Sequence, residues 1–203
     1  MGCEKSKAMP QENAVHPAVI RNEQGHDRKS TENYTFSDVQ IDIIQSTWPL
    51  VSRDLIGNGT SVFLDIFTTE PNVKKLFPFK NVDSQQLVNN PLFKIHASSF
   101  MQAVDVVCSS LSTIEKDCPV SRRLIILGAQ HATVPGFDMV YFSIFAKCLH
   151  MTWERVLKEE YTEEVKDAWT TLFDFVMDRI SDGYVLYNQE ELSREKAKFD
   201  IEQ

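Results

Sequence analysis

Apolar residues recur every three to four positions along most of the chain between residues 36 and 187, which is the spacing of one face of a helix. No segment shows the strict alternation of polar and apolar residues that is typical of a half-buried strand. Helix-starting residues precede several of these segments. Ser37 to Gln40 has the form of a capping box, and Asn90 stands before Pro91. The sequence therefore predicts an all-α fold.

The periodic segments predict seven or eight helices. They span about residues 38–53, the segment through Val62 and Phe67 to Glu70, a short helix with Val73, Leu76 and Phe77, about 91–111, a segment that includes His131, about 138–157, and a last helix capped by Thr162. We expect Pro49 to kink or end the first helix, because proline lacks a backbone donor. Residues 80–90 are polar and are expected to be irregular.

Composition indicates one folded domain with a tail at each end. The chain has 203 residues, of which 42% are hydrophobic, enough for one core. We assign residues 1–35 to a disordered tether, 36–187 to the folded domain and 188–203 to a charged tail. A net charge of −8 and the absence of a basic stripe argue against a nucleic-acid partner. The four cysteines lack the paired spacing of a zinc site.

The first residues carry a lipidation motif. Met1-Gly2-Cys3-Glu4-Lys5-Ser6 fits the pattern for N-myristoylation of Gly2, and the adjacent Cys3 is placed for palmitoylation. Two acyl chains give a stable anchor where one gives only reversible binding. No run of about 18 apolar residues predicts a spanning helix. The motif predicts attachment to the cytoplasmic face of a membrane, with the plasma membrane favoured. A chance match would leave the protein in the cytoplasm.

Two histidines lie on the apolar stripes of separate predicted helices. His96 shares a face with Phe100 and Val104, and His131 shares a face with Leu124 and Leu127. A single inward histidine is more often a hydrogen-bonded core residue than a ligand. Two imidazoles on facing helices, however, can bind a flat metallocofactor from both sides.

The ordered motifs resemble the globin family over residues 36–187. The resemblance rests on Trp48 late in the first helix, on Phe63, Phe67 and Pro71, on Phe77 within Leu76-Phe77-Pro78-Phe79, and on His96 and His131 in their sequence contexts. Among globins the chain is most similar to the membrane-anchored globin X type, with neuroglobin-like and nematode globins as neighbours. The resemblance implies a globin fold of seven to eight helices around a haem pocket.

The resemblance also implies a cofactor and roles for site residues. The cofactor is haem b (iron protoporphyrin IX), with His131 as the proximal iron ligand. His96 takes the distal position, where it either donates a hydrogen bond to bound O₂ or ligates the iron, and we favour bis-histidine ligation. The residues expected to line the cofactor are Phe63, Phe77, Phe100, Leu127 and Phe137. Phe100, one turn after His96, is expected to crowd the ligand side.

The expected function is a haem globin tethered to the cytoplasmic face of a membrane. It would bind O₂, NO or similar small ligands and act in redox chemistry or sensing with an unidentified electron donor. The alternatives are an oxygen-binding or storage globin with five-coordinate iron and a haem-free helical adaptor. No dedicated catalytic motif is present, so any activity would be haem redox chemistry with nitrite, NO or superoxide.

Overall fold

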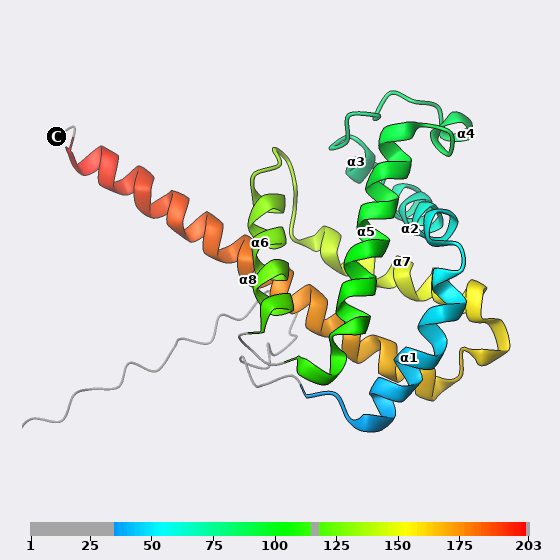
Figure 1. Cartoon of the computed structure of the whole chain (residues 1–203). Helices are drawn as coiled ribbons and strands as arrows, with labels where there is room; N and C mark the ends of the chain where they lie inside the picture. Colours follow the sequence, from blue (N-terminus) through cyan, green and yellow to red (C-terminus); the bar gives the residue numbers. More distant parts are fainter. Residues whose placement is uncertain (1–34, 115–117, 202–203) are drawn as a thin grey trace, which may run out of the picture. The chain divides into compact units, whose positions relative to one another are not determined.

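A computed structural model of the chain describes residues 35–114 and 118–201, and every regular element in these ranges is a helix (Figure 1). The helices are α1 (Asp38–Ser52), α2 (Leu55–Thr69), α3 (Pro71–Lys74), α4 (Ser84–Leu87), α5 (Pro91–Ser109), α6 (Pro119–Ala132), α7 (Val140–Leu157) and α8 (Glu163–Ile201), with single 3₁₀ turns at Leu111–Thr113 and Lys158–Glu160. The all-α prediction is confirmed. Gly2, Cys3 and the predicted tether up to residue 34 lie outside the described residues.

The helix starts predicted at Ser37 and Asn90 are present in the structure with their capping hydrogen bonds. The Ser37 hydroxyl accepts a hydrogen bond from the Gln40 amide at 3.2 Å, and the Gln40 side chain accepts one from the Ser37 amide at 3.0 Å. The Asn90 side chain accepts from the Phe93 amide at 3.2 Å, and Pro91 occupies the first position of α5. These contacts satisfy backbone donors that a helix start leaves unpaired.

The predicted elements differ from the structure at three places. Helix α3 ends at Lys74, so Leu76 and Phe77 lie beyond it. Phe77 precedes Pro78, and the residue before a proline avoids the α region. Residues 80–90, expected to be irregular, contain the single turn α4, which is capped by Asp83. Helix α1 continues to Ser52, three residues past Pro49, since proline removes only one of its hydrogen bonds.

A tryptophan cluster joins α1, α7 and α8. Trp48, Trp153 and Trp169 pack with ring centroids 5.4 Å apart for Trp153 and Trp169 and 6.2 Å apart for Trp48 and Trp169. The Trp169 indole donates to the Thr47 hydroxyl at 3.0 Å, and the Trp48 indole donates to the Asp105 carboxylate of α5 at 2.7 Å. The cluster buries large apolar rings while giving two of their N–H groups partners.

Two glycines bring the backbones of α6 and α8 into contact. A Cβ atom at Gly128 of α6 would overlap the Ile180 carbonyl oxygen and lie 2.7 Å from its carbonyl carbon. A Cβ atom at Gly183 of α8 would meet the carbonyl of Ile125 in the same way. Only residues without a side chain permit this approach. The crossing therefore fixes the position of α6, which carries His131.

Helix α8 continues without a break through the tail predicted from residue 188, and Figure 1 shows its C-terminal part projecting from the other helices. Its outer turns carry charged pairs, among them Arg194 with Glu191 at 2.5 Å and with Glu190 at 3.6 Å. Within residues 35–114 and 118–201, no helix combines the length and the apolar character needed to cross a bilayer.

Candidate functional site

The two predicted ligand histidines are partly buried on α5 and α6. Burial lowers the pKa of His96, and the neighbouring His131 lowers the pKa further because two positive rings would repel. Burial also lowers the pKa of His131, an effect larger than the opposing one of its hydrogen bond to Leu127. Both imidazoles are therefore neutral at neutral pH. A neutral ring nitrogen is the form that binds a metal.

The His131 ring is oriented by its own helix. Its Nδ1 lies 2.8 Å from the carbonyl oxygen of Leu127, one turn earlier on α6. A carbonyl only accepts, so Nδ1 carries the proton and Nε2 keeps a free lone pair. Metal-ligating histidines are typically held in this way. Leu127, expected from sequence as a wall residue, therefore also fixes the tautomer of His131 through its backbone.

Aromatic rings surround His131. Phe137 lies 5.1 Å from the His131 ring, centroid to centroid, and the buried Phe142 of α7 lies at 5.7 Å. The hydroxyl of Tyr184 on α8 donates to the Phe137 carbonyl at 3.1 Å. The predicted wall residue Phe137 is thus brought to His131 and held there from α8.

Other aromatic rings surround His96. The Phe63 and Phe77 rings meet the His96 ring edge-on, at centroid distances of 4.8 and 4.9 Å. Phe100 lies 5.7 Å from Phe63 and 4.9 Å from Phe145 of α7. The structure therefore places Phe63 and Phe77 against His96 and Phe100 against Phe63; that these rings line a cofactor stays a prediction.

Phe142 and Phe145 are site residues that the sequence interpretation missed. Phe142 contacts His131, whereas Phe145 contacts Phe100 and Phe63 on the other side. They are three residues apart on α7, so they project from one helix face. Apolar periodicity predicts an inner face for a helix over about 138–157, but periodicity cannot tell which members of such a face reach a site.

The donor set suits a planar cofactor better than a bare metal ion. Among the described residues, no three histidine, cysteine, aspartate or glutamate side chains are grouped to hold an ion. A porphyrin supplies four nitrogen ligands itself and needs only one or two axial ones. His131 has a free Nε2, His96 is neutral, and the walls between them are aromatic. The residues present fit haem.

Sequence comparisons relate the chain to known globins. The family model described as Globin matches residues 60–180. The chain is 29% identical to cytoglobin-2 of Oryzias latipes over 150 residues, which cover 73% of this chain and 82% of that protein. It is 23% identical to neuroglobin of Dissostichus mawsoni over 150 residues, covering 73% of this chain and 92% of the relative.

A comparison with solved structures agrees with the sequence comparisons. The structure is similar to the crystal structure of a hexacoordinated haem protein from an anhydrobiotic tardigrade, with a TM-score of 0.69 and 27% sequence identity. The similarity covers 74% of this chain and 96% of the tardigrade protein. The fold thus matches that of a solved haem protein over nearly the whole length of that protein.

Proposed function

This chain belongs to the globin family and binds haem, and we propose that His131 and His96 both coordinate the iron of haem b. The observation that carries the proposal is the hydrogen bond between His131 Nδ1 and the Leu127 carbonyl, which leaves Nε2 as the ligand atom. Similarity to a protein described as hexacoordinated supports a second axial ligand, and His96 is the neutral imidazole available for it.

Each part of the site has a distinct task in this proposal. Haem, when bound, supplies reversible binding of small gaseous ligands such as O₂ and one-electron chemistry. The Leu127 carbonyl holds the His131 ring and raises its basicity. Phe63 and Phe77 pack on His96 and exclude water. Phe100 packs against Phe63 on the same side, with ring centroids 5.7 Å apart. Because His96 is proposed to ligate the iron, a gas molecule would bind there only after His96 moved away.

Replacement of His96 by alanine tests the second ligand. In the natural protein, carbon monoxide binding to the reduced state is expected to reach a plateau rate at high gas concentration, because release of His96 becomes limiting. The variant lacks the competing ligand, so its binding rate is expected to rise linearly and to exceed the plateau by about ten-fold or more. Flash photolysis measures both rates.

A matched control is His150 of α7, which hydrogen-bonds Tyr161 at 2.5 Å and packs against Phe173 of α8 with ring centroids 5.0 Å apart. Its replacement by alanine is expected to leave the plateau unchanged. Linear binding in the natural protein up to the highest gas concentration would instead support five-coordinate iron and oxygen storage.

We further propose that the protein works at the cytoplasmic face of the plasma membrane, held by acyl chains on Gly2 and Cys3. Support comes from the fit of residues 1–6 to the myristoylation pattern and from the cysteine beside the acceptor glycine. An anchored protein gains nothing as a diffusing oxygen carrier. We therefore favour sensing or redox chemistry with O₂, NO, nitrite or superoxide and an electron donor near the lipid surface.

The anchor proposal predicts the effect of Gly2→Ala. Without the acceptor glycine, myristoylation is lost, and the protein is expected to move from the membrane to the soluble fraction of fractionated cells. Cys3→Ser removes only the second chain and is expected to give weaker, reversible association. Membrane association that is unchanged in Gly2→Ala would refute lipid anchoring at this position.

A further inference from the structure

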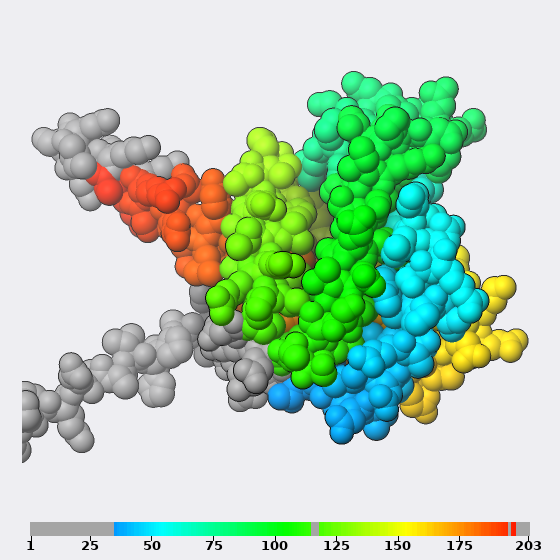
Figure 2. Space-filling view, in the orientation of Figure 1, coloured from blue at the N-terminus to red at the C-terminus, as the bar shows by residue number. Residues whose placement is uncertain are grey.

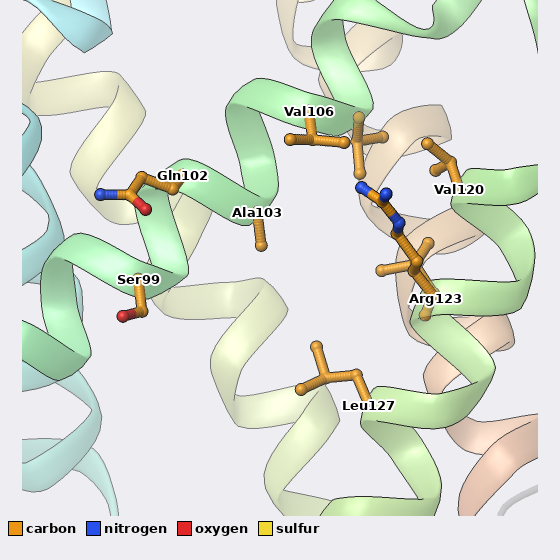
Figure 3. A pocket seen from close by; sticks show the side chains of 9 residues that line it. Ser99, Gln102, Ala103, Val106, Val120, Arg123 and Leu127 are labelled. Atoms are coloured by element: carbon orange, nitrogen blue, oxygen red, sulfur yellow. The ribbon is translucent and has the colours of Figure 1, made fainter.

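A tyrosine and a histidine form a hydrogen-bonded pair at the corner between α7 and α8. The Tyr161 hydroxyl oxygen and His150 Nδ1 are 2.5 Å apart. Figure 2 shows this corner (yellow) at the surface, at the edge of the molecule away from α6. The space between α5 and α6 in Figure 3 belongs instead to the candidate haem site, because Leu127 lines it. The proposed coordination of the iron therefore gives the Tyr161–His150 pair no role.

Both members of the pair are neutral at rest. Burial lowers the pKa of His150, and the positive charge of Lys166 lowers it further. Burial raises the pKa of Tyr161 to about 12, and the nearby carboxylates of Glu154 and Glu163 add to this effect. The resting pair is therefore a phenol beside a neutral imidazole.

The direction of the hydrogen bond follows from the neighbours of His150. The Thr170 hydroxyl donates to the Lys166 carbonyl at 2.8 Å, so the Thr170 oxygen accepts from His150 Nε2, which is 3.4 Å away. Nε2 thus carries the ring proton, and Nδ1 accepts from the Tyr161 hydroxyl. The phenol proton of Tyr161 therefore points at a base. The Tyr184 hydroxyl, by contrast, donates to a backbone carbonyl, which is not a base.

The corner that carries Tyr161 has an unusual backbone. Lys158, the first residue after α7, has a φ of 51°, in the region that favours glycine. The Lys158 carbonyl accepts a hydrogen bond from the Tyr161 amide at 3.0 Å, across a single 3₁₀ turn. Strained residues persist where the surrounding structure requires them, and they are frequent at functional sites. Here the strained turn returns the chain to α7, where Tyr161 meets His150.

Aromatic rings connect the pair to the tryptophan cluster. Phe173 of α8 lies 5.0 Å from the His150 ring and 5.7 Å from the Trp153 ring, centroid to centroid. Trp153 follows Phe145 of the candidate site on the same helix, about 12 Å further along α7. Trp153 is fully buried, and its indole N–H has no hydrogen-bond partner among the described residues. An oxidised Trp153 therefore has no neighbouring base to take its proton.

The other two indoles of the cluster have weaker proton acceptors than Tyr161 has. Trp169 donates to the Thr47 hydroxyl, and Trp48 donates to the Asp105 carboxylate. Carboxylates are weaker bases than imidazole, and a hydroxyl is weaker still. Within residues 35–114 and 118–201, Tyr161 is thus the oxidisable ring of this group whose proton is bonded to the strongest base.

We propose that Tyr161 is a reversible one-electron donor that holds an oxidising equivalent arriving through the tryptophan cluster, with His150 as the acceptor of its proton. One electron passes from the Tyr161 ring to the oxidised tryptophan, and the O–H bond breaks as its proton moves to His150 Nδ1. The products are a neutral tyrosyl radical, a reduced indole and an imidazolium. Loss of the proton together with the electron avoids a positive charge on a partly buried phenol.

The same two atoms carry the return step. One electron from a donor and the proton from His150 restore the phenol and the neutral imidazole. The first oxidant is expected to be a peroxide that reacts at the haem. This source rests on the proposed function, whereas the transfer from tryptophan to Tyr161 does not.

Flash oxidation of the full-length, haem-loaded protein by a soluble ruthenium complex with a cobalt(III) quencher tests the pair without peroxide. Freeze-trapped samples are expected to show a tyrosyl radical by electron paramagnetic resonance, which distinguishes it from a tryptophan radical. Tyr161→Phe keeps the aromatic ring and is expected to leave the radical on tryptophan. Tyr187→Phe, at a half-buried tyrosine of α8, is the matched control and is expected to keep the tyrosyl signal.

His150→Gln separates proton transfer from hydrogen bonding. Glutamine offers Tyr161 an acceptor oxygen but is not a base. Transfer from tryptophan to tyrosine, followed by transient absorption, is expected to slow about 100-fold or more, because a positioned base contributes at least this much. A purely structural role of His150 would leave this rate unchanged. Because the pair acts only after an electron is lost, His150→Ala remains a control for iron coordination.

A tyrosyl signal that persists in Tyr161→Phe, or a tryptophan radical alone in the natural protein, would overturn the proposal. A transfer rate that His150→Gln leaves unchanged would also overturn it, and this variant decides the question if Tyr161→Phe fails to fold. Peroxide added to the haem-loaded protein is expected to give the same Tyr161 radical, and its absence would refute the haem as the source. The flash experiment needs no haem, so protein that failed to take up haem would refute the proposed function alone.

Discussion

Replacing His131 with alanine is expected to weaken haem binding by more than about 100-fold. Loss of a residue that merely supports a metal ligand costs about 10- to 100-fold, and loss of the ligand itself costs more. In this protein His131 is the histidine whose tautomer is fixed, with Nε2 left free by the bond from Nδ1 to Leu127. Titration of the apoprotein with haem, followed through the Soret band, measures the affinity.

Two controls separate ligand loss from damage to the fold. Added imidazole is expected to restore a low-spin spectrum in the alanine variant, because it can occupy the space that the ring leaves. His150→Ala removes another partly buried histidine, on α7, and is expected to keep the natural affinity. A His131→Ala protein with unchanged affinity and an unchanged Soret band would exclude His131 as the principal ligand.

Gly128→Ala is expected to lower both stability and haem affinity. The new Cβ atom would overlap the Ile180 carbonyl, a backbone group that cannot rotate away, so α6 must shift from α8. Overpacking of this kind costs about 1–3 kcal/mol, which for a domain of this size lowers the melting temperature by roughly 2–12 °C. Because Gly128 lies one turn before His131, the shift also moves the ring. Thermal unfolding and haem titration measure the two effects.

Further substitutions test whether the crossing of α6 and α8 positions His131. The Cβ atom of Gly183→Ala would meet the Ile125 carbonyl of α6, so this variant is expected to lose stability and haem affinity to a similar extent. The double variant is expected to lose less stability than the two single variants added together, because one shift of α6 from α8 relieves both overlaps. Gly57→Ala is the control, since the atoms nearest to its Cβ atom belong to the side chain of Asp54, which can move, and not to a backbone carbonyl. Equal, small effects of all three substitutions would show that the α6–α8 crossing does not position His131.

Local patterns in the sequence were sufficient to predict most helices and their starts. The capping box at Ser37 and the pair Asn90-Pro91 act within a few residues, so their hydrogen bonds can be read from the order of side chains. The prediction that His96 and His131 converge on one site came from the globin resemblance, because periodicity shows only that each ring lies on an inner helix face. In the structure Phe63 and Phe77 lie against His96.

Contacts between helices far apart in the sequence could not be predicted. Nothing local to Gly128 or Gly183 shows that these two residues meet at a helix crossing. The roles of Phe142 and Phe145 likewise depend on how α7 lies relative to α5 and α6. The single turn α4 was missed because four residues are too few to display a period. Such features depend on packing rather than on propensity.

The absorption spectrum of the reduced, ligand-free protein tests the central claim most directly. If His131 and His96 both coordinate the iron, the spectrum is low-spin, with two sharp, separate bands in the visible region, and His96→Ala converts it to a high-spin form with one broad band. A high-spin spectrum in the natural protein would contradict bis-histidine coordination. The absence of any Soret band after reconstitution with haem would contradict the site itself.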